Sequence, residues 1–390
     1  MTNPYTPGEV PRLLAGRREE LDRIRDLFAR VVTYAEMGGP LLVFHAPRGI
    51  GKTSLLRAAQ DEAEPLGFVT VWVSCSRGTP VLPELTAALS QALDAADITP
   101  GGQAGKRWRA RLDKFGVELG GFGVKVSADL VGDPVPDTGV AAAPLAALEG
   151  MLHDAATLVR SRGGAGLAVF IDELHAATRV ELALLLNALQ NLAGRRADNP
   201  LAVIAAGLPV TPEAITRAAT FGERSTFVPL DVLSTTDARE LLTAPAASLG
   251  VGWTSRALDA VIDQARGYPY FLQLLGSATW DAARPERGAK IGLPDARRGL
   301  TRAQAQVRSM YAARWGSATP GEQAFLGAMA RQGDGNVTRA AIAADLGVDS
   351  RSLSVARERL IEKAIIEPVG HGLVRFTLPG FAAWLRQQGS

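Results

Sequence analysis

The chain has 390 residues, of which 47% are hydrophobic, and a formal net charge of +2 at pH 7. This length suggests two or three domains, and the apolar fraction is sufficient for a core in each of them. The single cysteine, Cys75, excludes an intramolecular disulfide and a cysteine-based zinc cluster. No apolar run is long enough to span a bilayer and the polar start lacks a secretory signal, so we expect a cytoplasmic protein without membrane contacts.

Prolines and a glycine at positions 3–8 predict an extended entry into the fold. The acidic residues Glu19, Glu20 and Asp22 suit the first turn of a helix that runs to Val32.

The stretch 41–59 combines an apolar β-type run, a glycine-containing loop and a helical run. This layout is typical of a phosphate-binding loop, in which backbone N–H groups and a helix N-terminus face the phosphates. The pattern G-x-x-x-x-G-K-[ST] is met except at its first position, where alanine replaces glycine. The loop residues are Ala46, Pro47, Arg48, Gly49, Ile50, Gly51, Lys52, Thr53 and Ser54.

Two side chains of this loop carry the expected chemistry. Lys52 would reach the β- and γ-phosphates of ATP, and the hydroxyl of Thr53 would ligate Mg²⁺. The alternative is a chance glycine-rich turn, which the agreement of strand, loop and helix disfavours.

A second buried strand is predicted at 68–74 and a helix at 81–96. Residues 98–143 then form a variable insertion with glycine and proline clusters, either a hairpin or a long loop. A solvated flap is the preferred interpretation, and a hairpin that touches a partner or DNA is the alternative.

After a helix at 144–160, the apolar run 167–171 ends in two acids, Asp172 and Glu173. Carboxylates at the C-terminal end of a buried parallel strand lie where ligands bind. Asp172 would hold Mg²⁺, and Glu173 would orient the attacking water. Either acid could instead cap the next helix, and His175 is interpreted as a polar loop residue.

Further strands are predicted at 201–209 and 225–230, and a helix with a leucine face at 178–193. Strands alternating with helices favour a doubly wound parallel sheet, so the predicted fold class is α/β.

This combination resembles the AAA+ and STAND ATPases, in particular bacterial proteins similar to the archaeal and eukaryotic origin-recognition initiators. The matching features are the loop 46–54, the strand and acids 170–173, the strand end 207–209, and the segments 16–19, 223–224 and 267–273. The resemblance implies that Gly16 and Arg17 line the adenine side of the pocket, and that Gly267 and Pro269 belong to a G-x-P element of a helical lid.

The resemblance also implies a role for Arg224 as an arginine finger that acts in trans, and thus a homo-oligomer. A surface arginine is the alternative. Two departures concern hydrolysis: Ala206 and Gly207 stand where a polar sensor residue is usual, and the lid lacks an evident sensor-two arginine. We therefore expect a slow, regulated ATPase.

The C-terminal half is expected to contain a helical lid at 231–283, a basic linker and helix at 284–316, and a winged helix-turn-helix at 317–390, after an ATPase core at 1–230. Asp349 or Ser350 is expected to cap a third helix that runs to Ala364, in which Leu353, Leu360 and Ile361 pack inward. The side chains predicted to contact duplex DNA are Arg351, Ser352 and Arg357 of that helix and Arg375 of the wing.

These patterns predict an ATP-binding and ATP-hydrolysing switch that couples nucleotide state to DNA binding. The first alternative is a STAND-type signalling or defence regulator whose winged helix docks on a protein partner. A metabolic P-loop kinase or transferase is a third hypothesis, which the acid pair and the appended winged helix disfavour.

Overall fold

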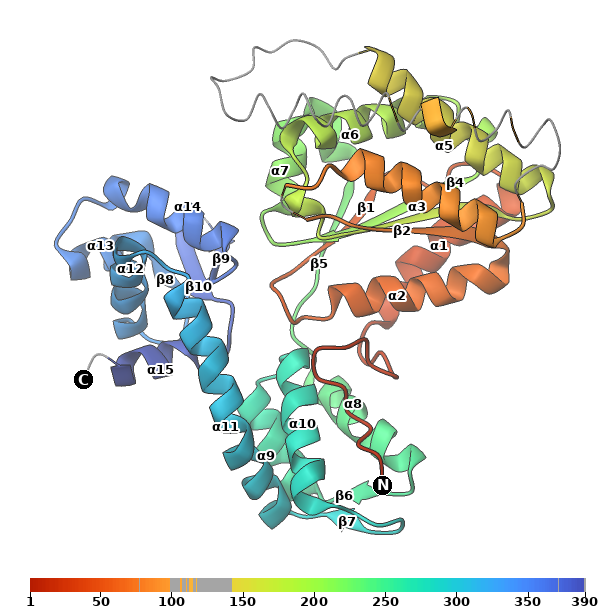
Figure 1. Ribbon diagram of the computed structural model, residues 1–390. Coiled ribbons are helices and arrows are strands. Elements are labelled where there is room, and N and C mark those ends of the chain that lie inside the picture. Colours follow the sequence, from red (N-terminus) through yellow and green to blue (C-terminus); the bar gives the residue numbers. More distant parts are fainter. Residues whose placement is uncertain are drawn as a thin grey trace. The chain divides into compact units, whose positions relative to one another are not determined.

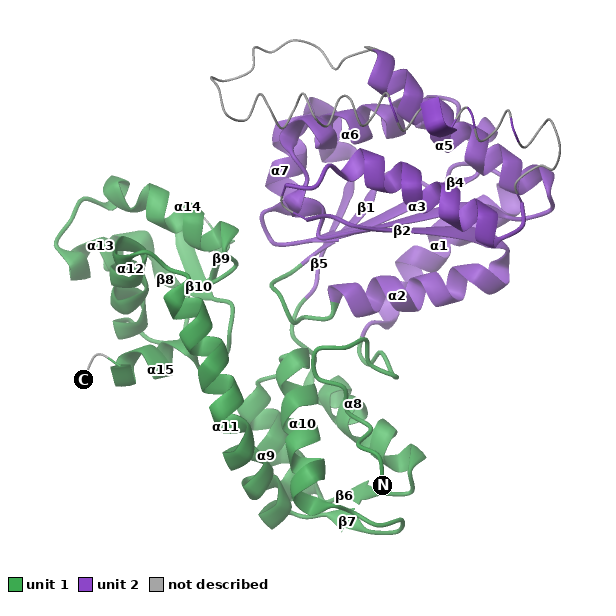
Figure 2. Ribbon diagram, viewed as in Figure 1, with its two compact units in different colours: residues 1–16, 46–51, 231–390 green, residues 17–45, 52–230 purple. Residues whose placement is uncertain are grey.

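The computed structural model describes residues 1–76, 78–98, 142–370 and 372–388, together with 106, 110, 112–114 and 117. Most of the predicted insertion at 98–143, with its proposed flap or hairpin, lies outside the described residues. The chain divides into two compact units (Figure 2). We call them the sheet unit, Arg17–His45 and Lys52–Leu230, and the helical unit, Met1–Gly16, Ala46–Gly51 and Asp231–Ser390.

The sheet unit contains a five-stranded parallel sheet in the order β2-β3-β4-β1-β5. Every residue of β3 and of β4 is buried, as expected for central strands covered on both faces. The strands are β1 (Leu42–His45), β2 (Phe68–Ser74), β3 (Gly166–Asp172), β4 (Leu201–Gly207) and β5 (Thr226–Pro229).

Helices cover both faces of this sheet, with α1 and α2 on one face and α3, α5 and α6 on the other (Figure 1). The α-helices are α1 (Arg18–Tyr34), α2 (Lys52–Ala63), α3 (Val81–Ala95), α5 (Ala142–Ser161), α6 (Arg179–Gly194) and α7 (Thr211–Ala218). The 3-10 turns are η1 (Glu64–Leu66), η2 (Leu174–Ala176), η3 (Arg196–Asp198) and η4 (Thr220–Arg224). The predicted fold class, a parallel P-loop sheet with flanking helices, is confirmed.

The first part of the helical unit is a helical bundle beside a short parallel ladder of β6 and β7. Its elements are α8 (Thr235–Ser248), β6 (Gly252–Trp253), α9 (Ser255–Ala265), α10 (Pro269–Ala283), β7 (Lys290–Ile291) and α11 (Leu293–Gly316). The N-terminal segment packs on this bundle, since the hydroxyl of Tyr5 donates a hydrogen bond of 2.5 Å to the carbonyl of Leu242.

Helix α11 lies against α10, and Gly299 allows the close approach. A Cβ at this position would come within 2.4 Å of the Cα of Thr279, so a larger residue would push the two helices apart. The predicted linker and helix at 284–316 are therefore part of the packed bundle in the structure, and α11 continues into the C-terminal elements.

The C-terminal elements form a winged-helix-like arrangement of helices beside the antiparallel sheet β8-β10-β9. They are α12 (Pro320–Arg331), β8 (Val337–Thr338), α13 (Arg339–Leu346), η5 (Ser350–Leu353), α14 (Ser354–Glu362), β9 (Ile366–Gly370), β10 (Leu373–Phe376) and α15 (Phe381–Gln388).

The third helix differs from the prediction at both ends. Asp349 caps a 3-10 turn, accepting the N–H of Arg351 at 2.7 Å, and the α-helix begins only at Ser354. It ends before Ala364, which has a left-handed φ of 53°. Leu353, Leu360 and Ile361 are buried as predicted. In the described part of the chain, no helix is both long and apolar enough to cross a membrane.

Candidate nucleotide-binding and catalytic site

A hydroxyl and a carboxylate that lie 119 residues apart in sequence meet in the sheet unit. Thr53 Oγ1 donates a hydrogen bond of 2.6 Å to Asp172 Oδ2. Asp172 ends the central strand β3 and is 4% exposed, while Thr53 lies in the first turn of α2. These are two hard oxygen atoms of the kind that Mg²⁺ prefers, so the residues present fit this ion.

Lys52 is the first residue of α2 and is only 5% exposed. His45 ends the neighbouring strand β1. Burial lowers the pKa of His45, and the charge of Lys52 lowers it further. The imidazole is therefore neutral at pH 7, and Lys52 supplies the positive charge at this edge of the sheet.

Glu173 follows β3 in a left-handed conformation with a φ of 54°, which is costly for a residue with a Cβ. Its amide N–H donates to Asp172 Oδ1 at 2.9 Å, so the two acids are held together. The side chain of Glu173 is 30% exposed. This carboxylate is therefore accessible at the strand end, whereas that of Asp172 is buried.

His175 contacts Glu173 and was not assigned a site role from the sequence. Its Nε2 lies 3.5 Å from Glu173 Oε2, and its side chain is 6% exposed. The N–H of Leu208, directly after β4, donates to His175 Nδ1 at 3.4 Å. Because Nδ1 accepts this bond, the other ring nitrogen, Nε2, carries a proton, and this nitrogen faces Glu173.

Leu208 belongs to the strand end at which the sequence offers only Ala206 and Gly207 instead of a polar sensor residue. The structure brings a backbone N–H to the acid pair from this strand through an imidazole. The signal in the sequence was the position of His175, two residues after Glu173 at the end of the same strand.

The loop residues 46–51 are held within the helical unit by two tyrosines of the predicted lid. The hydroxyl of Tyr268 donates to the carbonyl of Arg48, and the N–H of Tyr270 donates to the carbonyl of Gly49 at 3.1 Å. Gly49 has a φ of 85°, and a Cβ there would come within 2.9 Å of the Tyr268 ring. Glycine is thus required at this position both by backbone conformation and by contact.

In the helical unit, the charged side chain of Arg314 lies close to the contact between Tyr268 and Arg48. Burial lowers the pKa of Arg314, the Tyr268 hydroxyl raises it, and the positive charge of Arg48 lowers it. Arg314 donates hydrogen bonds to the carbonyls of Lys363 and Ala364, at 3.3 and 3.0 Å, just after α14. Arg314 therefore faces inward, unlike Arg297, Arg298, Arg302 and Arg308, which are exposed on α11.

Two of the other predicted nucleotide contacts, Gly16 and Gly267, lie close to Leu233 in the helical unit. A Cβ on Gly16 would come within 2.9 Å of the Leu233 side chain, and one on Gly267 within 2.4 Å of its carbonyl. Pro269 begins α10. In the sheet unit, Arg17 is 5% exposed and forms an ion pair of 3.4 Å with Glu20. The remaining loop residues Ala46 and Ile50 are buried, and Pro47 precedes Arg48.

Arg224 ends η4 and precedes β5. Because the sheet is parallel, it lies at the amino edge, opposite to the carboxyl edge where Thr53 and Asp172 meet. Arg224 and the acids of the same chain are therefore not brought together, and the predicted role in trans stays a prediction.

The side chains predicted to contact DNA differ in their solvent exposure and in the partners they already have. Arg351 and Ser352 are exposed on η5, whereas Arg357 is half-buried and its Nε has no hydrogen-bond partner among the described residues. Arg375 forms an ion pair with the buried Glu367. On α14, Val355 is 60% exposed, which adds an apolar group to the same surface. The DNA contacts also stay predictions.

Two family models match the chain. Residues 13–204 match an AAA ATPase domain, and residues 308–385 match a domain of unknown function, DUF8462. The first match begins before α1, includes the loop and both acids, and ends within β4. Residues 13–204 are thus similar to an AAA ATPase domain, and this match supports ATP hydrolysis by the chain.

Several solved structures are similar to the whole chain. The Walker-type ATPase PABY2304 of Pyrococcus abyssi has 16% sequence identity, covers 96% of each chain and has a TM-score of 0.62. Cdc6p of Pyrobaculum aerophilum has 14% identity, covers 98% of this chain and 97% of its own, and has a TM-score of 0.48. The Orc1 protein of Aeropyrum pernix, solved in complex with DNA, has 15% identity over 98% of this chain and 95% of its own, with a TM-score of 0.45. No curated protein sequence matches the chain. The first of these similarities shows the shared fold.

Proposed function

We propose that this chain, with its AAA ATPase domain, is a slow ATP-driven switch that couples nucleotide state to duplex DNA binding through its winged-helix-like C-terminal part. The observation that carries this proposal is the pair of hydrogen bonds from Tyr268 and Tyr270 to the carbonyls of Arg48 and Gly49. A change in the phosphate loop on nucleotide binding or release would alter these bonds.

In this proposal ATP is the substrate and Mg²⁺ the cofactor. Thr53 and Asp172 would hold the ion, which neutralises charge on the phosphates. Lys52 supplies a cation to the phosphates from the start of α2, and Glu173 orients the attacking water. His175 fixes the direction of the Glu173 carboxylate.

Slow hydrolysis follows from two features of these residues. At the end of β4 the sequence has Ala206 and Gly207, and the N–H of Leu208 acts on Glu173 indirectly, through His175. The arginine that would stabilise the transition state is Arg224, which lies at the other edge of the sheet and would have to come from a second copy. Turnover would then depend on assembly.

The route from the loop to the C-terminal part runs through α11. Tyr268 and Arg48 both act electrostatically on Arg314, and Arg314 binds the carbonyls that follow α14. A second link joins the lid to the same part, since Arg266 lies 3.2 Å from Asp334. These contacts support a coupling between the loop and the surface formed by η5 and α14.

A specific observation also favours the second candidate, a STAND-type regulator whose winged helix docks on a protein. Val355 is exposed on α14, and Val348 is 44% exposed just before η5. Apolar groups are unusual on a surface that would bind mainly phosphates, and they are common in protein interfaces.

One titration separates the two candidates. The full chain is titrated with duplex DNA at several salt concentrations, together with Arg351→Ala and Val355→Ser. DNA binding requires that Arg351→Ala weakens affinity and lowers the salt slope by about one unit, because one phosphate contact is lost. In that case Val355→Ser should have little effect on the affinity for DNA. If the wild-type chain does not bind DNA at low salt, the protein-docking candidate replaces the first.

A further inference from the structure

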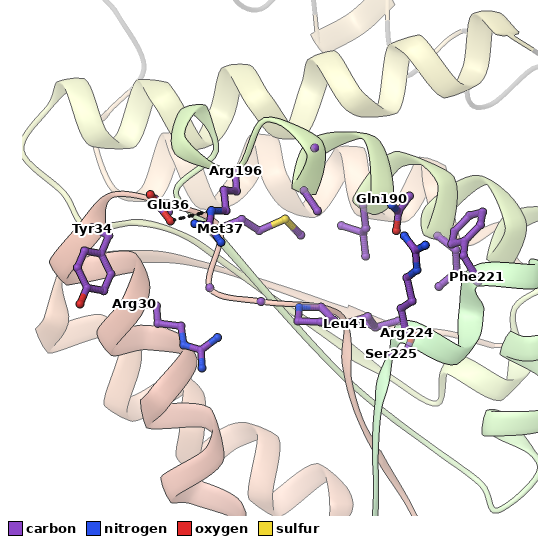
Figure 3. Close-up of a pocket in the computed structure, with 17 residues that line it drawn as sticks. Arg30, Tyr34, Glu36, Met37, Leu41, Gln190, Arg196, Phe221, Arg224 and Ser225 are labelled. Carbon is purple, nitrogen blue, oxygen red and sulfur yellow. Dashed lines mark ion pairs between the residues drawn. The ribbon is translucent and has the colours of Figure 1, made fainter.

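A cavity of about 610 Å³ lies in the sheet unit at the amino edge of the sheet (Figure 3). Its walls come from the end of α1, the segment before β1, the second half of α6, and η4. Asp172 ends β3 at the other edge of the sheet and accepts the hydrogen bond of Thr53 there, so this cavity is separate from the candidate nucleotide site. Its volume is in the range of pockets that bind small molecules, roughly 300 to 1,000 Å³.

The floor of the cavity is apolar, with the buried side chains Met37, Leu41, Leu186 and Leu189. Phe221 lies at one end of the cavity (Figure 3). Such a surface favours the apolar part of a ligand, because contact with it removes hydrocarbon from water.

The charges around this floor are mostly positive. Arg30, Arg196 and Arg224 line the cavity, and Glu36 is the one acid among its lining residues. Glu36 lies 3.2 Å from Arg196 and neutralises it. Among the residues that the structure describes, Arg30 and Arg224 form no ion pair with an acid. Three arginines less one glutamate leave two uncompensated positive charges beside an apolar floor.

We propose that this cavity is a binding site for a small organic anion, a carboxylate carried on an apolar chain. The apolar chain would lie over Leu41, Leu186 and Leu189, and the carboxylate would accept hydrogen bonds from Arg224 or Arg30. A guanidinium group is suited to this because its planar N–H groups match the two carboxylate oxygens. This site goes beyond the proposed switch and does not depend on it.

The location of the cavity would allow a bound ligand to influence the phosphate loop. Leu41 lines the cavity and directly precedes β1, and β1 leads into the phosphate loop. The N–H of Thr226 at the start of β5 donates to the carbonyl of Leu41 at 2.9 Å, which ties both strands to the cavity wall. An occupied cavity would therefore restrain the strand that carries the loop.

The test is calorimetric titration of the full chain with decanoate, below its micelle concentration. Decanol, which lacks the charge, and acetate, which lacks the chain, serve as matched ligands. Decanoate is expected to bind at least about tenfold more tightly than either, because each lacks one of the two recognised parts. Equal binding of decanoate and decanol, or no binding of decanoate, would overturn the proposal.

Variants locate the site. Arg30→Gln is expected to weaken decanoate about tenfold while leaving decanol unchanged, because it removes one charge-assisted contact. Ala193→Trp, an exposed position that lines the cavity, should block both ligands by filling the space. Arg217→Gln, an exposed arginine paired with Glu213 elsewhere in the sheet unit, should behave as wild type.

The outcomes separate this site from the proposed ATPase. If Ala193→Trp and Arg30→Gln bind decanoate as the wild type does, the ligand binds elsewhere and the cavity proposal is wrong, whatever the ATPase activity. If ATP hydrolysis fails but these variants lose decanoate as expected, the cavity proposal stands without the switch.

Discussion

His175 Nε2 lies 3.5 Å from the Oε2 atom of Glu173, and both residues follow the central strand β3. The second ring nitrogen of His175 accepts the backbone N–H of Leu208, so the imidazole is fixed between two strand ends. A carboxylate held in this way has a defined direction, as a residue that orients a water molecule requires.

This contact predicts how two substitutions differ in kinetics. Glu173→Gln should retain ATP binding and lose turnover, since the amide cannot accept the proton of the attacking water. His175→Ala should lower kcat about tenfold with little change in KM, because it releases the carboxylate without removing it. His175→Gln should recover much of the activity, since its amide can both accept from Leu208 and donate to Glu173. Steady-state ATPase assays measure all three, and equal activity in His175→Ala and wild type would remove the positioning role.

The hydrogen bond from Tyr268 to Arg48 predicts a specific effect of one hydroxyl group. Tyr268→Phe keeps the buried ring but removes this hydrogen bond to the Arg48 carbonyl, at a cost of about 0.5 to 1.5 kcal/mol in stability. Tyr270→Phe is the matched control, because Tyr270 contacts Gly49 through its backbone N–H, which phenylalanine keeps. Nucleotide affinity and the temperature of thermal unfolding should change in Tyr268→Phe and should stay at the wild-type values in Tyr270→Phe. The same behaviour in both variants would show that the hydroxyl has no special role.

The pair of Glu322 and Lys363 predicts a dependence of stability on pH. Glu322 is 2% exposed and accepts a hydrogen bond from Lys363 Nζ at 2.6 Å. Burial alone would raise the pKa of Glu322, but Lys363 and the N–H of Thr319 outweigh it and lower the pKa below the ordinary 4.5. A lowered folded pKa means that the stabilisation is present above pH 4.5 and is lost as pH falls through the folded value.

Glu322→Gln should therefore destabilise the chain by about 1 to 3 kcal/mol at pH 7 and make unfolding less sensitive to acid. Glu358→Gln, at an exposed position of α14, is the control and should change neither quantity. Denaturant unfolding at pH 7 and near pH 4 measures both effects. An unchanged acid dependence in Glu322→Gln would contradict the assignment of this pair.

If Arg224 acts in trans, hydrolysis per chain should rise with protein concentration, and Arg224→Ala should abolish this rise. The reason is that Arg224, at the amino edge of the sheet, cannot reach the site of Asp172 and Glu173 at the carboxyl edge of its own chain. ATPase assays over a wide dilution range, with sedimentation in parallel, measure the effect. A constant rate per chain in a protein that stays monomeric with every nucleotide rejects the finger.

The sheet could be predicted from the sequence because its strands are continuous apolar runs bounded by clear signals. Residues 68–74 were predicted as a strand and are β2, and the acids at 172 and 173 follow β3 as expected. The helix predicted at 178–193 from its leucine face is α6, which begins at Arg179, and in the structure Thr178 and Glu181 form a capping box at its start. Local patterns of this kind can be interpreted without the tertiary structure, because the physical cause of each element lies in its own residues.

The contacts that depend on tertiary structure could not be predicted in this way. Nothing in the local sequence indicates that Tyr268 meets a carbonyl 220 residues away, or that Arg314 faces inward while neighbouring arginines of α11 are exposed. The α-helix begins later than predicted because Asp349 caps a 3-10 turn at Ser350–Leu353, and the α-helix starts only at Ser354.

The most direct test of the central claim is the affinity of the full chain for duplex DNA, measured by fluorescence anisotropy with ADP and with a slowly hydrolysed ATP analogue. The two nucleotides should give affinities that differ by about fivefold or more in the wild type, the usual lower range of coupling between sites. This difference should shrink in Tyr268→Phe and persist in Tyr270→Phe. Equal DNA affinity with both nucleotides in the wild-type chain would show that nucleotide state is not coupled to DNA binding.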